Sequence, residues 1–231
     1  ETVLPFCILD GTLITAMRTS AVGGVMAKYT APSNATTATL VGAGVIGRTM
    51  VSAIHVALPQ IKTMYLCDLD LAKAEEIAKE YGDSLGVTII PSTDSKGCAL
   101  KSQLIVGETT SRKPIIDKSW LTPGCGLVTM HSGEVCEEVV LAADYWTQLK
   151  QHVNPLSKLT KEGKLAEGEI IDLCQLVLGE KKLRTSDDQF VMSASMGLGA
   201  LDIMIGYQMY LNAMEKGIGT KVNLWDKPLW E

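Results

Sequence analysis

Gly42, Gly44 and Gly47 are the residues whose types and spacing point most directly to chemistry, because they form a Gly-x-Gly-x-x-Gly pattern. A short β-prone run precedes them at residues 37–41, and a segment with helical spacing follows at 46–58. Glycines at such a junction leave the backbone N–H groups of a helix N-terminus open to a pyrophosphate. The pattern therefore predicts a dinucleotide site, and the alternative is a tight structural turn that binds nothing.

An acidic residue stands where a dinucleotide site would need one. Asp68 ends a second β-prone run at residues 63–68, about 20 residues beyond the glycines. A carboxylate at that point accepts hydrogen bonds from the adenine ribose and repels a 2′-phosphate. Since no arginine follows directly, the sequence predicts NAD as the cofactor rather than NADP.

Arg18 is a charged residue in a mainly apolar pattern of helical spacing over residues 10–28. A guanidinium can bind a substrate carboxylate or a cofactor phosphate through two parallel hydrogen bonds. A surface position or a structural ion pair would explain Arg18 equally well. The spacing leaves these interpretations open.

Further polar residues follow two predicted strands, at residues 103–106 and 126–130. His131 and Glu134 come after the second strand, and an acid there could take up and return a proton at a substrate amine or imine. Thr109 and Thr110 follow the first strand, where hydroxyls can contact ribose or nicotinamide. The alternative is that all four are ordinary loop residues, which for a lone histidine is the more common case.

These residues need a scaffold in which strands and helices alternate, and the pattern supplies it. We predict strands at 37–41, 63–68, 87–90, 103–106 and 126–130, helices at 10–28, 46–58, 71–81, 154–179 and 197–216, and a loop at 185–188. The methionine-rich last helix fits a core or subunit interface. The predicted fold class is α/β, a doubly wound parallel sheet of the Rossmann type.

Composition narrows the function classes for this chain of 231 residues, which is 46% hydrophobic and carries a net charge of −5. Scattered basic residues argue against nucleic acid, and neither a membrane span nor a signal peptide is evident, so we expect a cytoplasmic protein. Six cysteines without a CxxC pair favour reduced, buried thiols over disulfides or a metal site. Cys125 and Cys136 flank the candidate acid and are the two that could be reactive.

Several segments together resemble the ornithine cyclodeaminase and mu-crystallin family over nearly the whole chain. They are Leu13-Ile-Thr-Ala-Met-Arg-Thr-Ser-Ala-Val22, Thr39-Leu-Val-Gly-Ala-Gly-Val-Ile-Gly47, Thr109-Thr-Ser-Arg-Lys-Pro114, Thr185-Ser-Asp-Asp188, Met196-Gly-Leu-Gly-Ala-Leu-Asp202 and Gly217-Ile-Gly-Thr220. Three more, Asp144-Tyr-Trp-Thr-Gln148, Glu162-Gly-Lys164 and Leu176-Val-Leu-Gly179, are similar to a subgroup from siderophore and peptide-antibiotic pathways that makes a precursor of 2,3-diaminopropionate.

The resemblance implies an NAD(H)-dependent oxidoreductase that acts on an amino acid or its imine and works as a homodimer. It implies that the amides of Val45 and Ile46 bind the pyrophosphate, that Asp68 binds the ribose, and that Thr109 lies beside the cofactor. By the same resemblance, Ser195 and Met196 lie near the nicotinamide, and Arg18 contacts the substrate carboxylate or the cofactor. Glu134 aligns with the family's catalytic aspartate.

Two departures from the family pattern leave other functions open. Cyclodeaminases have a Gly-Gly-Asp-Cys-Pro-Gly-like run where this chain reads Met130-His-Ser-Gly-Glu134. The N-terminal part of the family's substrate domain also has no counterpart, so we expect residues 1–30 and 191–231 to be parts of a discontinuous substrate and dimerisation domain around a Rossmann domain at 31–190. The alternatives are a cyclodeaminase-type lyase or a mu-crystallin-like nucleotide-binding protein without turnover.

Overall fold

The computed structural model describes residues 5–131, 133–149 and 155–223, which form a single parallel sheet with helices on both faces. Its strands are β1 (Thr37–Val41), β2 (Thr63–Cys67), β3 (Thr88–Ser92), β4 (Leu104–Gly107), β5 (Gly126–Thr129), β6 (Tyr145–Gln148), β7 (Ile170–Asp172) and β8 (Val191–Ala194). Its helices are α1 (Gly11–Thr30), α2 (Val45–Ala57), α3 (Leu71–Leu85), α4 (Ser95–Ala99), α5 (Glu137–Leu141), α6 (Pro155–Lys161), α7 (Leu173–Val177) and α8 (Gly199–Glu215), with 3-10 turns η1 (Lys118–Trp120) and η2 (Glu167–Glu169).

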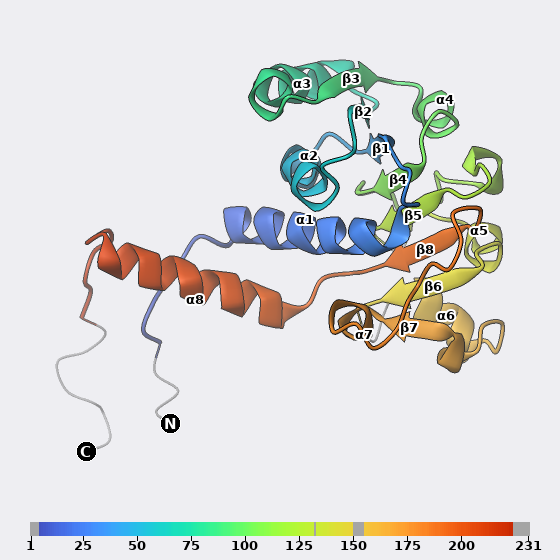
Figure 1. Ribbon diagram of the computed structural model, residues 1–231. Coiled ribbons are helices and arrows are strands. Elements are labelled where there is room, and N and C mark those ends of the chain that lie inside the picture. Colours follow the sequence, from blue (N-terminus) through green and yellow to red (C-terminus); the bar gives the residue numbers. More distant parts are fainter. Residues whose placement is uncertain (1–4, 132, 150–154, 224–231) are drawn as a thin grey trace.

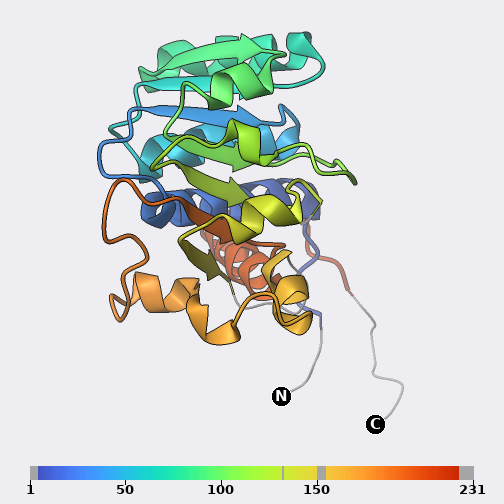
Figure 2. The same cartoon turned by 90° about the vertical axis from the view of Figure 1, so that its right-hand side faces the viewer.

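The eight strands lie in the order β3-β2-β1-β4-β5-β8-β6-β7, and all their pairings are parallel. Helices α1, α2, α3 and α7 cover one face, and α4, α5 and α6 cover the other (Figures 1 and 2). Each face has its own apolar core, since Met26, Met50 and Leu40 belong to one cluster and Leu127 and Val139 to the other. This arrangement confirms the predicted doubly wound α/β sheet.

Strand register brings the ends of four strands to the same level. Val41 pairs with Gly107, Gly107 with Thr129, and Thr129 with Ala194. The chain runs outward from β1 to β2 and β3, and returns on the other side of β1 as β4. Ligands of such sheets bind at the carboxyl edge where the strand order reverses, which here is the junction of β1 and β4.

Helix α1 packs against α2 and β5 rather than standing apart from the sheet. Small residues allow the close approach: a Cβ on Gly24 would lie 2.9 Å from the carbonyl oxygen of Ala53 in α2. At the helix end, the Arg184 guanidinium donates to the carbonyl oxygen of Thr30 at 2.8 Å. The segment before β8 thus fixes the C-terminal end of α1.

The second half of the chain differs from the sequence prediction. Within the described residues, the helix predicted over 154–179 is replaced by α6, η2, β7 and α7. Gly163, with φ of 72°, ends the first of these, and Ile170 and Ile171 pair with β6 because β-branched residues suit a strand. Strands β6 and β8 were not predicted, and β8 extends the sheet to Ala194, beyond the proposed domain boundary at residue 190.

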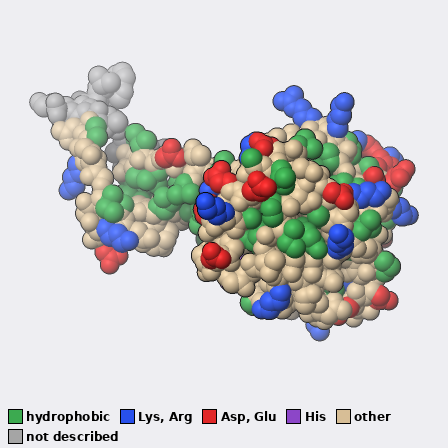
Figure 3. All heavy atoms as spheres, turned by 90° about the horizontal axis from the view of Figure 1, so that it is seen from above, with side chains coloured by type: hydrophobic (Ala, Val, Ile, Leu, Met, Phe, Trp, Pro, Cys, Tyr) green, Lys and Arg blue, Asp and Glu red, His purple; other side chains and the backbone are tan. Residues whose placement is uncertain are grey.

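Helix α8 leaves the sheet domain and packs against α1 (Figure 1). No residue of α8 is fully buried, and large apolar side chains such as Ile203 and Met204 are exposed. Figure 3 shows hydrophobic side chains gathered on this projecting part of the molecule. Across the described ranges, no helix has both the length and the apolar character that crossing a membrane requires.

Candidate functional site

The glycine turn joins β1 to α2 at the point where the strand order reverses. Gly42 has φ of 119°, and a Cβ on Gly47 would lie 2.0 Å from the carbonyl oxygen of Gly42, so both positions require glycine. Gly44 differs, because a Cβ there would meet no heavy atom within 4 Å. Gly44 is the N-cap of α2 and forms no side-chain cap, so the first amides of α2, at the exposed Val45 and at Ile46, have neither a capping side chain nor an acceptor within the helix.

Asp68 lies at the end of β2, next to the glycine turn. Its Oδ2 accepts a hydrogen bond from the Ala43 amide at 2.8 Å, and its Oδ1 accepts one from the Asp70 amide at 2.9 Å. The side chain is half-buried, and each carboxylate oxygen has a further lone pair. The sequence-predicted ribose acid is therefore held in place by the turn that it would serve.

Glu134 is fully buried at the carboxyl ends of β4 and β5. Its Oε1 accepts a hydrogen bond from the Thr109 amide, and its Oε2 lies 2.9 Å from Thr129 Oγ1. A Cβ on Gly107 would lie 2.7 Å from Oε2, so the glycine that ends β4 makes room for this carboxyl. The structure thus brings Glu134 and Thr109 together, although they lie 25 residues apart in sequence.

Burial raises the pKa of Glu134, while hydrogen bonds from Thr109 and Thr129 oppose the rise. The Thr129 hydroxyl also lies 2.8 Å from the carbonyl oxygen of His131, but it has a single proton for these two acceptors. A protonated Glu134 resolves this competition, because its own O–H can donate to Thr129 Oγ1. The site therefore suits a carboxyl group that gains and loses a proton.

Glu108 is a site residue that sequence reasoning missed. It follows β4 directly, and its amide donates to the carbonyl oxygen of Val41 at 3.0 Å, so its backbone continues the pairing of β4 with β1. Its side chain is buried against the glycine turn. Burial, with the charge of Glu134 second, raises its pKa well above the ordinary value. In the sequence, the signal was an acid directly after an apolar strand.

Arg18, Ser195 and Met196 form the far side of the same edge. Arg18 Nε donates to Asp202 Oδ1 of α8 at 2.9 Å, which is the ion pair considered among the sequence alternatives. A Cβ on Gly197 would lie 2.5 Å from Arg18 Nη1, so the guanidinium lies against the segment after β8. Ser195 is buried there, and its amide donates a hydrogen bond to the carbonyl oxygen of Thr129 at 3.0 Å. Met196, the next residue, is partly exposed.

Other candidate residues lie elsewhere or differ in exposure. Thr110 is exposed, and His131 Nδ1 accepts a hydrogen bond from the Gly133 amide at 3.1 Å. Cys125 precedes β5 at the amino edge of the sheet, away from the glycine turn, and Cys136 is the N-cap of α5. Of the six cysteines, predicted as buried, three are buried, Cys136 is half-buried, and two are exposed, namely Cys7 and Cys174.

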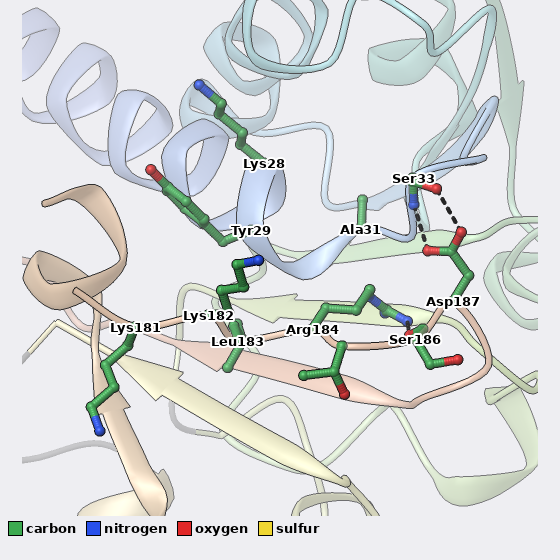
Figure 4. Close-up of a pocket in the computed structure, with 11 residues that line it drawn as sticks. Lys28, Tyr29, Ala31, Ser33, Lys181, Lys182, Leu183, Arg184, Ser186 and Asp187 are labelled. Atoms are coloured by element: carbon green, nitrogen blue, oxygen red, sulfur yellow. Dashed lines mark hydrogen bonds between the residues drawn. The ribbon is translucent and has the colours of Figure 1, made fainter. Parts of the chain in front are cut away.

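A separate hollow of about 500 Å³ lies at the amino edge, between the end of α1 and residues 181–187 (Figure 4). Lys28, Lys182 and Arg184 line it, and Figure 4 shows their side chains pointing in different directions. Arg184 donates to main-chain carbonyl groups, and Asp187 accepts from Ser33. This hollow does not adjoin the glycine turn, so it is not part of the candidate site.

A doubly wound parallel sheet with a Gly-x-Gly-x-x-Gly turn at its switch point defines the class of Rossmann dinucleotide-binding proteins. The chain belongs to the ornithine cyclodeaminase/mu-crystallin family, whose profile matches residues 1–217. The predicted family is thereby confirmed.

Relatives of this chain include named oxidoreductases of amino acids and imines. N-((2S)-2-amino-2-carboxyethyl)-L-glutamate dehydrogenase of Staphylococcus aureus (strain NCTC 8325 / PS 47) is 26% identical over an alignment 232 positions long, which covers 97% of this chain and 69% of that protein. The Thermococcus litoralis Delta(1)-pyrroline-2-carboxylate reductase, solved in complex with NADH and L-proline, is 29% identical with a TM-score of 0.86, covering 96% of this chain and 71% of that one.

An archaeal alanine dehydrogenase dimer with bound NAD has the same fold, with a TM-score of 0.83 at 22% identity, over 97% of this chain and 72% of that one. The predicted class, NAD(H)-dependent oxidoreductases of amino acids or imines, is the class that the names of the dehydrogenase and the NADH-bound reductase indicate.

Proposed function

We propose that this protein is an NAD(H)-dependent oxidoreductase that acts on an amino acid or its imine. The observation that carries the proposal is a buried acid, Glu134, at the same sheet edge as an uncapped helix N-terminus and a ribose-type acid, Asp68. A binding site for a nucleotide alone has no need of a buried proton carrier beside it. The names of the relatives support the same class.

The residues at this edge fit NAD(H). Open space at Gly44 and the free amides of Val45 and Ile46 suit a pyrophosphate, while Gly42 and Gly47 shape the turn. The remaining contacts would come from Asp68 on the ribose and from Thr109, Thr110 and Ser195 nearer the nicotinamide. When bound, the cofactor supplies or accepts a hydride at nicotinamide C4, and the partner atom is the α-carbon of the substrate.

The chain's own residues would bind the substrate and move a proton. Glu134 holds a proton at its carboxyl and exchanges it with the substrate nitrogen, which changes charge as amine and imine interconvert. The Nη groups of Arg18 would donate hydrogen bonds to the substrate carboxylate, while the hydrogen bond from its Nε to Asp202 holds the guanidinium in place. Met196, partly exposed after β8, contributes an apolar contact to the substrate.

We favour a glutamate-linked substrate, because the Staphylococcus aureus relative is named for a glutamate that carries an amino-carboxyethyl group on its nitrogen. We therefore propose that the product is a precursor of 2,3-diaminopropionate in siderophore biosynthesis. We also propose a cytoplasmic homodimer. The exposed apolar side chains of α8 support the dimer, because a continuous apolar face of this kind is typical of a protein interface.

A second candidate function is nucleotide binding without turnover. Glu134 has no exposed surface, and both of its oxygens already have partners, which is the pattern of a carboxyl that joins the ends of two strands. In that case Glu134 stabilises the fold and the cofactor regulates or accompanies binding of another ligand. The two functions differ in whether NADH is consumed.

Glu134→Gln separates these functions. We expect the wild-type protein to change absorbance at 340 nm with an imine or amino-acid substrate. The variant should lose at least about 100-fold in kcat, with NADH affinity kept at about pH 6, because general acid–base catalysis contributes about that much. Glu138→Gln, on the exposed side of α5, is the matched control and should keep full activity. Retained turnover in Glu134→Gln would assign the acid a structural role, and no turnover by the wild type with any substrate tested would favour the binding protein.

A further inference from the structure

The Glu108 carboxyl is a buried acid without a hydrogen-bond partner. Its two oxygens have no surface open to solvent and, among the described residues, no donor or acceptor within reach. Buried carboxyl groups normally have such partners, because an unpaired buried polar group costs about 1–3 kcal/mol in folding free energy. An unpaired buried carboxyl at a ligand site therefore indicates a function for Glu108 in ligand binding.

The position of the carboxyl is set by the glycine turn. A Cβ on Gly42 would lie 3.4 Å from Glu108 Cγ, and a Cβ on Gly47 would lie 3.2 Å from Glu108 Oε1. Gly47 belongs to the first turn of α2, whose N-cap Gly44 offers no side-chain oxygen to the free amides. The Glu108 carboxyl therefore lies beside the helix end that would receive the cofactor pyrophosphate.

A helix N-terminus carries a partial positive charge that stabilises a nearby anion. An ionised Glu108 would be such an anion and would also repel a pyrophosphate within a few ångströms through a poorly solvated region. A neutral Glu108 neither interacts with the helix end as an anion nor repels the pyrophosphate. Occupation of the helix end by a dinucleotide and ionisation of Glu108 therefore oppose each other.

Other charged groups around the turn do not relieve this conflict. Glu134, from the loop after β5, is the charged neighbour that acts on Glu108, and its charge has the same sign. Asp68, after β2, is also acidic, and His131 acts on Glu134. Arg48 of α2 is bound by Glu76 and Glu80 of α3.

We propose that Glu108 is a proton-linked determinant of cofactor affinity: the dinucleotide binds to the protein in which the Glu108 carboxyl is neutral, and ionisation of that carboxyl weakens binding. The inference rests on the proposed function, because it requires that NAD(H) occupies the glycine turn. At a pH where the free protein holds Glu108 ionised, binding one dinucleotide takes up one proton from solvent onto the Glu108 carboxylate.

The test is NADH affinity across a pH series from about 6 to 9.5, measured by NADH fluorescence. We expect the wild-type dissociation constant to rise with pH, approaching about tenfold per pH unit once Glu108 ionises in the free protein. Glu108→Gln, a neutral side chain of the same shape, should bind at every pH as tightly as the wild type does at low pH. Glu134→Gln should keep the pH dependence and displace it to lower pH, since a like charge beside Glu108 is removed.

The outcomes distinguish the inference from the proposed function. A wild-type affinity that does not change with pH, a pH profile shared by Glu108→Gln, or loss of NADH binding in folded Glu108→Gln would each overturn the inference and leave the cofactor site intact. No NADH binding by the wild type at any pH would overturn the proposed function, and the inference with it. Should Glu108→Gln not fold, calorimetry of the wild type at alkaline pH in two buffers of different ionisation enthalpy decides: uptake near one proton supports the inference, and none overturns it.

Discussion

Glu108 and Glu134 lie at the ends of neighbouring strands, and burial raises the pKa of both carboxyl groups. A carboxyl whose pKa is higher in the folded protein than in the unfolded chain binds its proton more tightly when folded. Its contribution to stability is complete at low pH and is lost as pH rises from the ordinary glutamate value through the folded value. Most carboxyl groups in ion pairs have the opposite effect.

Glu108→Gln should therefore stabilise the protein increasingly as pH rises. Near pH 4 the variant and the wild type should unfold at similar temperatures, and above neutrality the variant should be more stable, by about 2–4 °C in Tm for each kcal/mol recovered. Calorimetry without cofactor from pH 4 to 9 measures the difference. Glu138→Gln, at an exposed site, serves as the control, and a constant Tm difference over the whole range would contradict the prediction.

Single residues show what sequence reasoning could and could not supply. Asp68 was predictable, because its distance from the glycines and its place at a strand end are both visible in sequence. Glu108 was not, since its burial depends on β4 lying between β1 and β5, which is a property of the assembled sheet. The Arg18 ion pair with Asp202 joins residues 184 positions apart, so sequence could name it only as one alternative.

At the scale of elements, the three glycines of the turn have different roles. Gly47→Ala should destabilise the fold, because its Cβ would lie 2.0 Å from a backbone oxygen that cannot move freely. Gly44→Val should fold normally, since the space there is open, but the side chain should obstruct the pyrophosphate and weaken NADH binding at least tenfold. Thermal unfolding and NADH fluorescence of the two variants test this separation. Normal stability of Gly47→Ala, or undiminished NADH affinity of Gly44→Val, would contradict it.

Elements were predicted well where the local pattern was strong. The first five strands and the helices predicted at 46–58 and 71–81 have glycine, proline or polar boundaries, and the structure places them close to the predicted limits, whereas α4 was not predicted. The helix prediction for residues 154–179 was wrong because short apolar runs fit a helix and a strand alike. Pairing of Ile170 and Ile171 with β6 makes that part of the segment a strand. The run Phe190-Val-Met-Ser-Ala194 has the apolar character of a buried strand, so β8 could have been recognised.

At the scale of the whole molecule, α8 presents apolar side chains to solvent on a projecting helix. The proposed homodimer predicts that Ile203→Glu with Met204→Lys raises the dimer dissociation constant at least tenfold, because charges would enter an apolar interface. Sedimentation velocity measures this, with Gln208→Glu on the same helix as the control. Unchanged Tm in the double variant would show that the fold is intact. A wild-type protein that stays monomeric at all concentrations would contradict the homodimer.

The central place of β8 in the sheet has a consequence for synthesis. β8 is the last strand among the residues that the structure describes, yet it lies between β5 and β6, and both β6 and β7 reach the rest of the sheet through it. As the chain emerges from a ribosome, β1 to β5 can assemble, and β6 and β7 can pair with each other, but no strand yet connects the two groups. A nascent chain that stops before Val191 would thus hold a half-built sheet with β5 as an open edge, a state prone to aggregation and suited to chaperone binding.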